Sequence, residues 1–543
     1  MTPSVVSLSA ADKVVPMVPR VWTIRIDASG PQTTARIDGE GCSVRDDGLR
    51  QTVFWNSCGQ WKPFLVLEGK EGRLTAMGGH VCPIYARQMD GVMWFSNVAS
   101  RLMRPGDVQS LDAFILLQNL TGISYPQNNF FKDIELLEAS ADYRLSADGI
   151  ERVGSVLADS AAMSAEDVLD IALGQWDAHL ATGADIAVLL SGGYDSRLNL
   201  AIACDAARRY GNRIWAFHER KDANEESIAV AVAATADVPL TVHDRNTFVG
   251  ADRPVVLEPT FIDLQSGFYR ENLMRWHACL THIRSLMPGC IIMGLGAEAH
   301  KGKFYRRVSS VAKDSSAVFG IDPIMVTAIG RKMGLHHRDH GSQERYFDAL
   351  TRRAASFENF AAQVDYIHYQ TYIAHGYGHR CHDLQQYFGI PFPFLDNAFL
   401  AAVFALPQEA KEGFALVTRG IDRLMPAISD VPYTSANEKA LDSSKGLSVT
   451  QVMRQLIRLL GPTYYDCFPP RRKGRIGLTT AETKVLEAIA SGSALMRLLV
   501  DQALRGVESV PFLHLDYLVQ SCLYLDQLER RVGVICDIDG GGV

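Results

Sequence analysis

The segment that decides the fold is residues 184–198, which read ADIAVLLSGGYDSRL. Residues 184–190 form a continuous apolar run of strand length, which ends abruptly at two adjacent glycines. Residues 197–211, RLNLAIACDAARRYG, then have the apolar spacing of a helix. A buried strand that leads through a glycine-rich turn into a helix is typical of an α/β protein with a parallel sheet.

The same alternation continues on both sides of this segment. Strands are predicted at 214–219 (IWAFHE) and 239–244 (PLTVHD), and a short one at 290–294 (CIIMG). Helices are predicted at 164–181, where SAED is a start signal, and at 225–237. Beyond about residue 250 the pattern is mostly helical. These elements predict a parallel sheet with helices on both faces, in a domain spanning residues 160–535.

The N-terminal part has a different pattern. Short runs with β-branched or aromatic residues alternate with Gly, Asp and Asn turns, which predicts an antiparallel, sheet-rich domain over residues 20–158. The runs are VWTIRIDA (21–28), WKPFLVLEG (61–69), GRLTAMG (72–78), GVMWFSN (91–97) and ADYRLSADG (141–149). One helix is expected among them, at SLDAFILLQNL (110–120).

Composition excludes several classes of protein. Hydrophobic residues make up 47% of the 543 and charged residues 21%, which excludes a mainly disordered chain. With 54 Lys+Arg against 61 Asp+Glu the net charge is −7, so we expect no nucleic-acid partner. The ten cysteines form no C-x-x-C pair, which predicts free thiols in a reducing compartment.

The ends and the apolar runs suggest a cytoplasmic protein. The first twenty residues lack the pattern of a signal peptide. The longest apolar stretch, residues 392–407, is too short to span a membrane and carries Asp396. We therefore expect no membrane span.

The turn at residues 191–196, SGGYDS, has the chemistry of an anion site. Its glycines let the backbone approach an anion, and the following helix N-terminus offers unpaired N–H groups. Ser191 and Ser196 can donate hydroxyls to phosphate oxygens. Asp195 would repel a bare phosphate, so it suggests a cation between them, most naturally Mg²⁺. A strand-to-helix turn capped by Asp and Ser would look similar in isolation, but the whole context favours a nucleotide site.

The run VLLSGGYDS resembles the pyrophosphate-binding loop of the asparagine-synthetase-like, AMP-forming ATP pyrophosphatases. The resemblance covers nearly the whole chain, strongly at this loop and weakly in the N-terminal third. It implies an N-terminal Ntn-hydrolase-like (degenerate glutaminase) α+β sandwich. A C-terminal α/β ATP-pyrophosphatase domain, similar to the adenine nucleotide α-hydrolases and with a helical C-terminal part, would follow. It also implies ATP and Mg²⁺, with ATP contacted by Leu190, Ser191, Gly192, Gly193, Asp195, Ser196 and Phe217.

A second motif, IIMGLGAE at 291–298, resembles the family's apolar strand ending in G-x-G-x-D. The resemblance implies that Gly294 and Gly296 contact the nucleotide and that Glu298, in place of Asp, completes the metal site with Asp195. Between the glycines, asparagine synthetases carry Glu and β-lactam synthetases carry Tyr, whereas this chain has Leu295. A leucine cannot accept a proton, so both specific activities are in doubt. His300 and His218 are alternative bases, although a packing or surface role is favoured for each.

Two later segments also resemble the family. YFGIPFPFLD at 387–396 is similar to its R-x-P-F-L-D segment, for which a packing role is expected. Arg380, upstream, could reach a substrate carboxylate or phosphate, or could be a solvated helix residue. PPRRKGRIGL at 469–478 resembles the late lysine loop and implies that Lys473 contacts the α-phosphate and stabilises charge; a solvated basic turn is the alternative.

The N-terminal stretch GHVCPIYARQMDGVMWFSN, residues 79–97, resembles the glutaminase domain of asparagine synthetases. That domain uses a cysteine directly after the initiator Met, but here position 2 is Thr2 and the first cysteine, Cys42, is internal. We therefore predict no glutaminase activity, and a role for this domain as scaffold or substrate-binding surface.

Histidines cluster in two further places. His368, His375, His379 and His382 have the offsets of one helix face, and His375 with His379 could ligate zinc. No Glu follows as in H-E-x-x-H and two glycines interrupt the stretch, so the metal interpretation is disfavoured. His336, His337 and His340 are expected in an exposed loop.

The resemblance implies an AMP-forming carbon–nitrogen ligase that adenylates a carboxylate for attack by an amine. We favour an intramolecular macrolactam-forming cyclase of the lasso-peptide type, acting on a peptide, with a protease or precursor-binding protein as partner. Amidation of a sugar acid or small metabolite by ammonia or an amine remains open. So does an inactive, nucleotide-binding paralogue that regulates a partner.

Overall fold

The computed structural model of the 543-residue chain describes most, but not all, of its residues. The described ranges are 21–27, 34–40, 42–48, 50–57, 60–111, 116, 131, 133–158, 162–220, 223–244, 273–287, 289–300, 348–411, 414–433, 480–489, 494–504 and 515–538. The following description concerns these residues alone.

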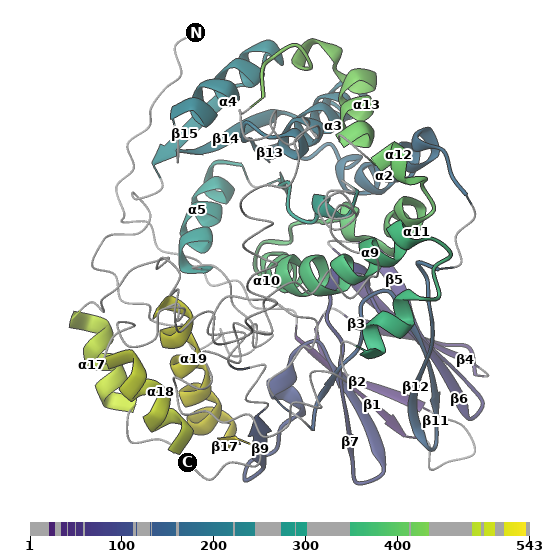
Figure 1. The fold of residues 1–543 in the computed structure, drawn as a ribbon, viewed down its shortest axis with the longest axis vertical. Coiled ribbons are helices and arrows are strands. Elements are labelled where there is room, and N and C mark those ends of the chain that lie inside the picture. Colours follow the sequence, from purple (N-terminus) through teal and green to yellow (C-terminus); the bar gives the residue numbers. More distant parts are fainter. Residues whose placement is uncertain are drawn as a thin grey trace, which may run out of the picture.

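The N-terminal strands form two antiparallel sheets, drawn in purple and blue at the bottom of Figure 1. One has the order β10-β7-β8-β1-β2 and the other β12-β11-β6-β5-β4-β3. Alternation explains their packing: in β1, Trp22, Ile24 and Ile26 are buried while their neighbours are partly exposed. The bounds are β1 Trp22–Asp27, β2 Thr34–Gly39, β3 Cys42–Asp46, β4 Arg50–Ser57, β5 Gln60–Glu68, β6 Glu71–Thr75, β7 Tyr85–Met89, β8 Val92–Ser96, β10 Glu135–Leu136, β11 Ala141–Ser146 and β12 Gly149–Ser155.

The five predicted N-terminal strands are present, as β1, β5, β6, β8 and β11. The helix expected at 110–120 is wrong at its start, because Ser110 and Leu111 belong to strand β9 (Val108–Leu111). Most of its remaining residues lie outside the described ranges. Short 3-10 turns, η1 (Gly78–His80) and η2 (Ala99–Leu102), connect the strands.

The central segment forms a four-stranded parallel sheet in the order β15-β14-β13-β16, as predicted. Its strands are β13 Ile186–Leu189, β14 Ile214–Arg220, β15 Leu240–Asp244 and β16 Cys290–Ile292. Helix α2 Ala165–Leu180 precedes β13, and the helices between the strands are α3 Tyr194–Tyr210, α4 Ala223–Thr235 and α5 Leu273–Leu286. Ser164 caps α2 in a capping box with Asp167, which confirms the start signal.

Helices cover both faces of this sheet. Ile186 and Val188 of β13 belong to a core shared with α2, α3 and α4, whereas Ala187 belongs to a core that includes Leu280 and Ile283 of α5. Successive residues of a strand point to opposite faces, so the continuous apolar run of β13 serves both cores. The chain is thus mixed α/β, with antiparallel sheets and a parallel sheet.

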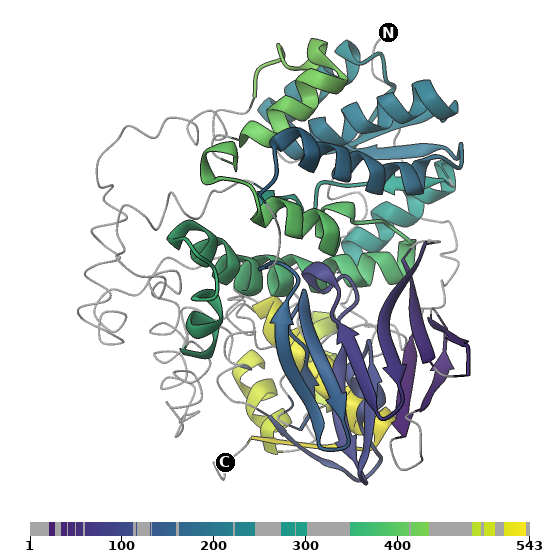
Figure 2. The ribbon, with the colours of Figure 1, turned by 90° about the vertical axis from the view of Figure 1, so that its right-hand side faces the viewer.

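The later helices fill the space between the two kinds of sheet and one side of the antiparallel part. In Figures 1 and 2, α9 and α10 run between the parallel sheet above and the antiparallel sheets below. These elements are η5 Ala297–His300, α9 Phe360–His368, the π-helix η7 Tyr369–Gly378, α10 His379–Phe388, η8 Pro393–Leu395, α11 Asn397–Phe404, α12 Gln408–Lys411, α13 Ala415–Leu424, η10 Pro426–Ile428, α17 Thr480–Ile489, α18 Ala494–Leu504, α19 Leu515–Gln527, η11 Leu528–Val532 and the strand β17 Ile535–Ile538.

Strand β17 pairs in parallel with β9, so a segment near the C-terminus joins the N-terminal part. Figure 1 shows α17, α18 and α19 grouped beside this pair. The sequence pattern had placed only one short strand after residue 250, and β17 is a second.

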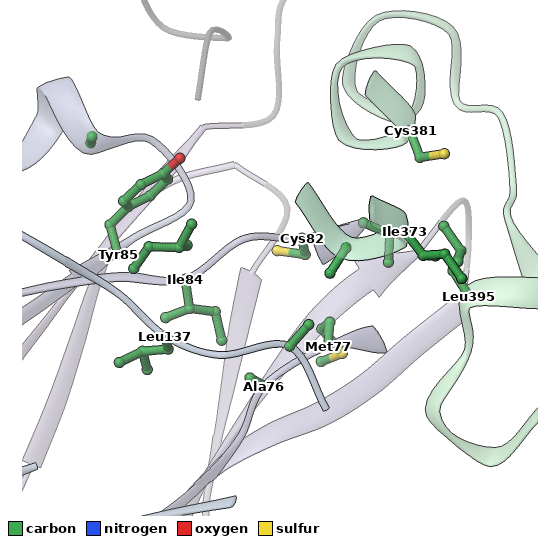
Figure 3. Close-up of a cluster of buried hydrophobic side chains, with 14 of the residues drawn as sticks. Ala76, Met77, Cys82, Ile84, Tyr85, Leu137, Ile373, Cys381 and Leu395 are labelled. Atoms are coloured by element: carbon green, nitrogen blue, oxygen red, sulfur yellow. The ribbon is translucent and has the colours of Figure 1, made fainter. Parts of the chain in front are cut away.

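One hydrophobic core joins the antiparallel part to the middle helices. Figure 3 shows part of this core at the junction, where Met77 and Cys82 lie toward Ile373 and Leu395, and Ile84 lies on the other side beside Leu137. Seven cysteine side chains are described, and all seven are free thiols, as predicted. None of the helices that the structure describes combines the length and apolar composition needed to cross a bilayer.

Candidate functional site

The predicted loop lies where the strand order of the parallel sheet reverses. From β13 the chain moves outward to β14 and β15 on one side, and it later returns to place β16 on the other. Val188 of β13 pairs with Ile292 of β16, so the two strands end side by side. Ligands of open α/β sheets bind at the carboxyl ends of strands at such a reversal. The sheet topology therefore selects the same place as the glycine-rich sequence.

Residues 191–196 form a compact turn held by two serine hydroxyls. The Ser196 Oγ accepts from the Ser191 N–H at 3.1 Å and lies 3.0 Å from the Ser191 Oγ. The Ser191 Oγ also accepts from the N–H of Gly193 at 3.3 Å. These contacts tie the turn to the first residues of α3 and put both hydroxyls on its inner side.

The N-terminus of α3 is suited to an anion. The helix begins at Tyr194, and its N-cap, Gly193, has no side chain to accept from the first-turn N–H groups. Such N–H groups, with the helix dipole, attract phosphate oxygens. Asp195 lies in the first turn, so its carboxylate would face a bound anion unless a cation lay between them. The residues present thus fit a phosphate accompanied by Mg²⁺.

The second predicted motif packs against the first. A Cβ added to Gly294 would lie 3.2 Å from the Cβ of Asp195, so only glycine lets the two backbones come this close without adjustment. Gly296 has a φ of +85° and abuts the Leu395 side chain, where a Cβ would lie 2.6 Å from the leucine Cγ. Leu295 is partly buried against the hydrophobic core. Sequence-distant residues of both motifs are therefore brought together.

His300 is the titratable side chain that the structure places beside Asp195. Its Nε2 lies 3.8 Å from the Asp195 Oδ1, and the ring is 1% exposed. Phe394 and Phe399 contact the ring edge-on, at centroid distances of 5.5 Å and 6.0 Å. His300 therefore packs behind the loop, next to the predicted metal ligand.

The predicted metal pair is described only in part. The backbone of Glu298 lies in η5, two residues before His300, but its side chain is outside the described part. Among described side chains, no group of three or more His, Cys, Asp or Glu is arranged to hold a metal ion. The pairing of Asp195 with Glu298 stays a prediction.

Three other candidates lie under the loop rather than on it. Leu190 is 2% exposed, and its N–H donates to the carbonyl of Phe217 at 2.8 Å. The Phe217 ring is buried and stacks on His243. His218 is buried too, and its Nδ1 donates to the Leu190 carbonyl at 2.9 Å. These buried residues therefore pack and hydrogen-bond at the end of β13, where the loop begins.

Sequence reasoning missed an aromatic stack at the start of α3. The ring of Tyr194 lies between Phe414 and Tyr433, at centroid distances of 4.5 Å and 3.8 Å. Arg197, one helical turn on, covers the other face of Tyr433. The available signal was an arginine inside an otherwise apolar helix run, directly after the SGGYDS turn.

The remaining predicted site residues are either outside the described residues or on elements other than the loop at residues 191–196. Lys473 lies outside the described residues, as do His336, His337 and His340. Arg380 lies on α10. The single helix face expected for His368 to His382 is wrong, because the π-helix η7 interrupts it and changes the spacing.

Within that stretch, two histidine side chains are described as packing groups. His368 stacks on Tyr372, and the Nδ1 of His382 donates to the carbonyl of Val81 at 3.0 Å. The side chains of His375 and His379 are outside the described part. Comparison with models of known protein families finds no match to this chain, and comparison with curated proteins finds none either.

Proposed function

We propose that the chain is an AMP-forming carbon–nitrogen ligase that binds ATP at residues 190–196. The observation that carries the proposal is the contact between the loop before α3 and the Gly294 turn, at the reversal of strand order. Two glycine-containing turns meet at the N-terminus of α3, and phosphates bound there could contact the backbone of either turn. In the proposal, this part is an ATP-pyrophosphatase domain and the antiparallel sheets are a degenerate Ntn-hydrolase-like domain.

In the proposed reaction, an oxygen of the substrate carboxylate attacks the α-phosphorus of ATP and pyrophosphate leaves. The amine then attacks the acyl carbon, AMP leaves with the carboxylate oxygen, and the amine loses a proton. The N–H groups of Gly193 and Tyr194 would hold the pyrophosphate, with hydroxyls from Ser191 and Ser196. Mg²⁺, when bound, would neutralise phosphate charge, and Asp195 is positioned to hold it.

The amine is proposed to come from the substrate. A glutaminase needs a reactive thiolate, and two cysteines of the antiparallel part are described in full. Burial raises the pKa of the Cys42 thiol, and it raises that of Cys82 well above the usual range. Both thiols therefore stay protonated and are poor nucleophiles. This disfavours either thiol as a source of ammonia from glutamine, and we favour a cyclase that joins a peptide's amine to its own Asp or Glu side chain.

The test is to incubate the full chain with ATP, Mg²⁺ and linear peptides that carry a free N-terminus and an internal Asp or Glu. We expect AMP and pyrophosphate in equal amounts, with a peptide product lighter by one water. Asp195→Asn should lower the rate at least about a hundredfold, since it removes charge from the metal position. Asp205→Asn, in the C-terminal half of the same helix with a side chain that is 22% exposed, is the matched control and should keep the rate.

The outcomes separate the alternatives. Formation of ADP, or full activity of Asp195→Asn, would contradict the proposal. AMP formation that requires added ammonia would leave adenylation in place and reject the cyclase. ATP binding without turnover on any carboxylate would favour a regulatory paralogue.

A further inference from the structure

A cleft of about 350 Å³ lies between the antiparallel part and the α/β part, away from the loop at residues 191–196. One wall comes from the sheet residues Trp55 and Lys62, and the opposite wall from Gln175 and His179 of α2. Residues 392–398 form its floor. Its volume lies in the range of small-molecule sites, which occur preferentially between domains.

Among the described lining residues, Lys62 and Asp396 form an ion pair, and His179 is a third titratable side chain. Asp396 also caps α11, because its Oδ1 accepts from the N–H of Ala398 at 2.9 Å. The Lys62 ammonium has three donor hydrogens, and its other acceptor is the Oε1 of Gln175 at a long 3.4 Å. It can therefore donate to one more anionic oxygen without losing Asp396.

A cationic ligand would fit less well. Such a ligand would compete for Asp396, which already serves both the helix N-terminus and Lys62. Lys62 would then depend on its weak contact with Gln175. A carboxylate can accept from the Lys62 ammonium while Asp396 keeps its partners, and the ammonium between the two carboxylates offsets their repulsion.

The rest of the lining is apolar on one side. Trp55 and Phe392 are buried there, together with Val81. We propose that this cleft binds a small organic carboxylate, with its carboxylate on Lys62 and an apolar or aromatic body against Trp55 and Phe392. The site is separate from ATP binding and does not depend on the proposed reaction.

The floor of the cleft separates it from the candidate nucleotide site. Phe394 and Phe399 contact His300, which lies behind Asp195. Asp396 and Asn397, in the same segment, line the cleft. The segment at residues 392–399 thus lines the cleft on one side and contacts His300, behind Asp195, on the other.

The experiment measures binding of three probes of similar size to the full chain by calorimetric titration: phenylacetate, phenethylamine and 2-phenylethanol. Phenylacetate should bind saturably, with a Kd of about 1 mM, and the other two at least about tenfold more weakly. Lys62→Met should weaken phenylacetate binding at least about tenfold, since a charge-assisted hydrogen bond is lost. Lys62→Arg should retain it.

Two further variants guard against a loss caused by misfolding. Lys70→Met, in the exposed turn after β5, changes the same residue type outside the cleft and should bind normally. Ala398→Phe, at an exposed lining position, should fill the cleft and abolish binding while Lys62 stays intact. Absence of phenylacetate binding, equal binding by Lys62→Met, or equal affinity for phenethylamine would overturn the proposal.

Discussion

The guanidinium of Arg197 lies 3.7 Å from the ring centroid of Tyr433, and it is fully buried. Its Nη1 donates to the carbonyls of Ile428 and Val431, at 3.2 Å and 2.6 Å, and its Nη2 donates to that of Pro432. Burial lowers the pKa of this arginine, but its charge is retained because the ordinary value is so high. Arg197 therefore joins the start of α3 to residues 428–433, in addition to the stacking of Tyr194 on Tyr433.

Replacing Arg197 by Met should destabilise the fold by about 3–5 kcal/mol, because the buried carbonyl of Ile428 and the partly buried carbonyls of Val431 and Pro432 lose their donor. Chemical denaturation monitored by circular dichroism measures this. Arg208→Met is the control on the same helix: its side chain is 60% exposed, so the loss should be below about 1 kcal/mol. Equal losses for the two variants would contradict the structural role assigned to Arg197.

Gly294→Ala tests the contact between the two turns. The added Cβ would lie 3.2 Å from that of Asp195, so one backbone must move by a few tenths of an ångström. We expect the KM for ATP to rise at least about tenfold in the pyrophosphate-release assay, with little change in stability. Gly174→Ala, in α2 with open space around it, should leave KM unchanged and stabilise slightly. An unchanged KM in Gly294→Ala would place the phosphates elsewhere.

The buried ion pair of Lys411 and Asp365 gives a third prediction. The two side chains are 2% and 9% exposed, and the Lys411 Nζ lies 2.9 Å from the Asp365 Oδ2. Lys411→Met alone should lower the free energy of unfolding by about 3–5 kcal/mol, because it leaves a buried carboxylate unpaired. The double variant Lys411→Met/Asp365→Leu should recover most of that loss. A double-mutant cycle by urea denaturation checks this, and simple additivity of the two single losses would contradict it.

The sequence was most informative where local pattern and tertiary structure agree. The run at 184–198 could be interpreted as strand, turn and helix because β13 is apolar on both faces and two glycines mark its end. The contact of Gly294 with Asp195 could be expected only from a resemblance, since the two residues are far apart along the chain. No local sequence pattern predicts that Tyr194 stacks on Tyr433, because this contact depends on how α3 packs against residues 428–433.

The two wrong predictions also depend on what a local pattern cannot detect. The periodicity of His368 to His382 assumed an unbroken α-helix, whereas η7 has the wider turns of a π-helix. Ser110 and Leu111, the last two residues of β9, fall inside the helix predicted at 110–120. The strand partner of β9, β17, lies more than four hundred residues later in the sequence, where no window-based pattern can detect it.

The buried His382 gives a prediction about pH. Burial lowers the pKa of its ring from 6.5 to about 4, although the hydrogen bond to Val81 opposes the shift. Between these two values the unfolded chain binds the proton and the folded chain does not, so acid favours unfolding. The stabilising contribution is thus complete above about pH 6.5. It is lost as the pH falls toward 4, by up to about 1.4 kcal/mol for each pH unit.

His382→Gln removes this titration and keeps a side chain that can donate to Val81. The free energy of unfolding, measured by urea denaturation from pH 4.5 to 8, should fall less steeply with acid in the variant than in the parent chain. Above about pH 7 the two curves should run parallel, because neither chain then takes up a proton at this position. Parallel curves over the whole range would show that the ring is protonated without cost in the folded state, which would contradict its burial where α10 packs against η1.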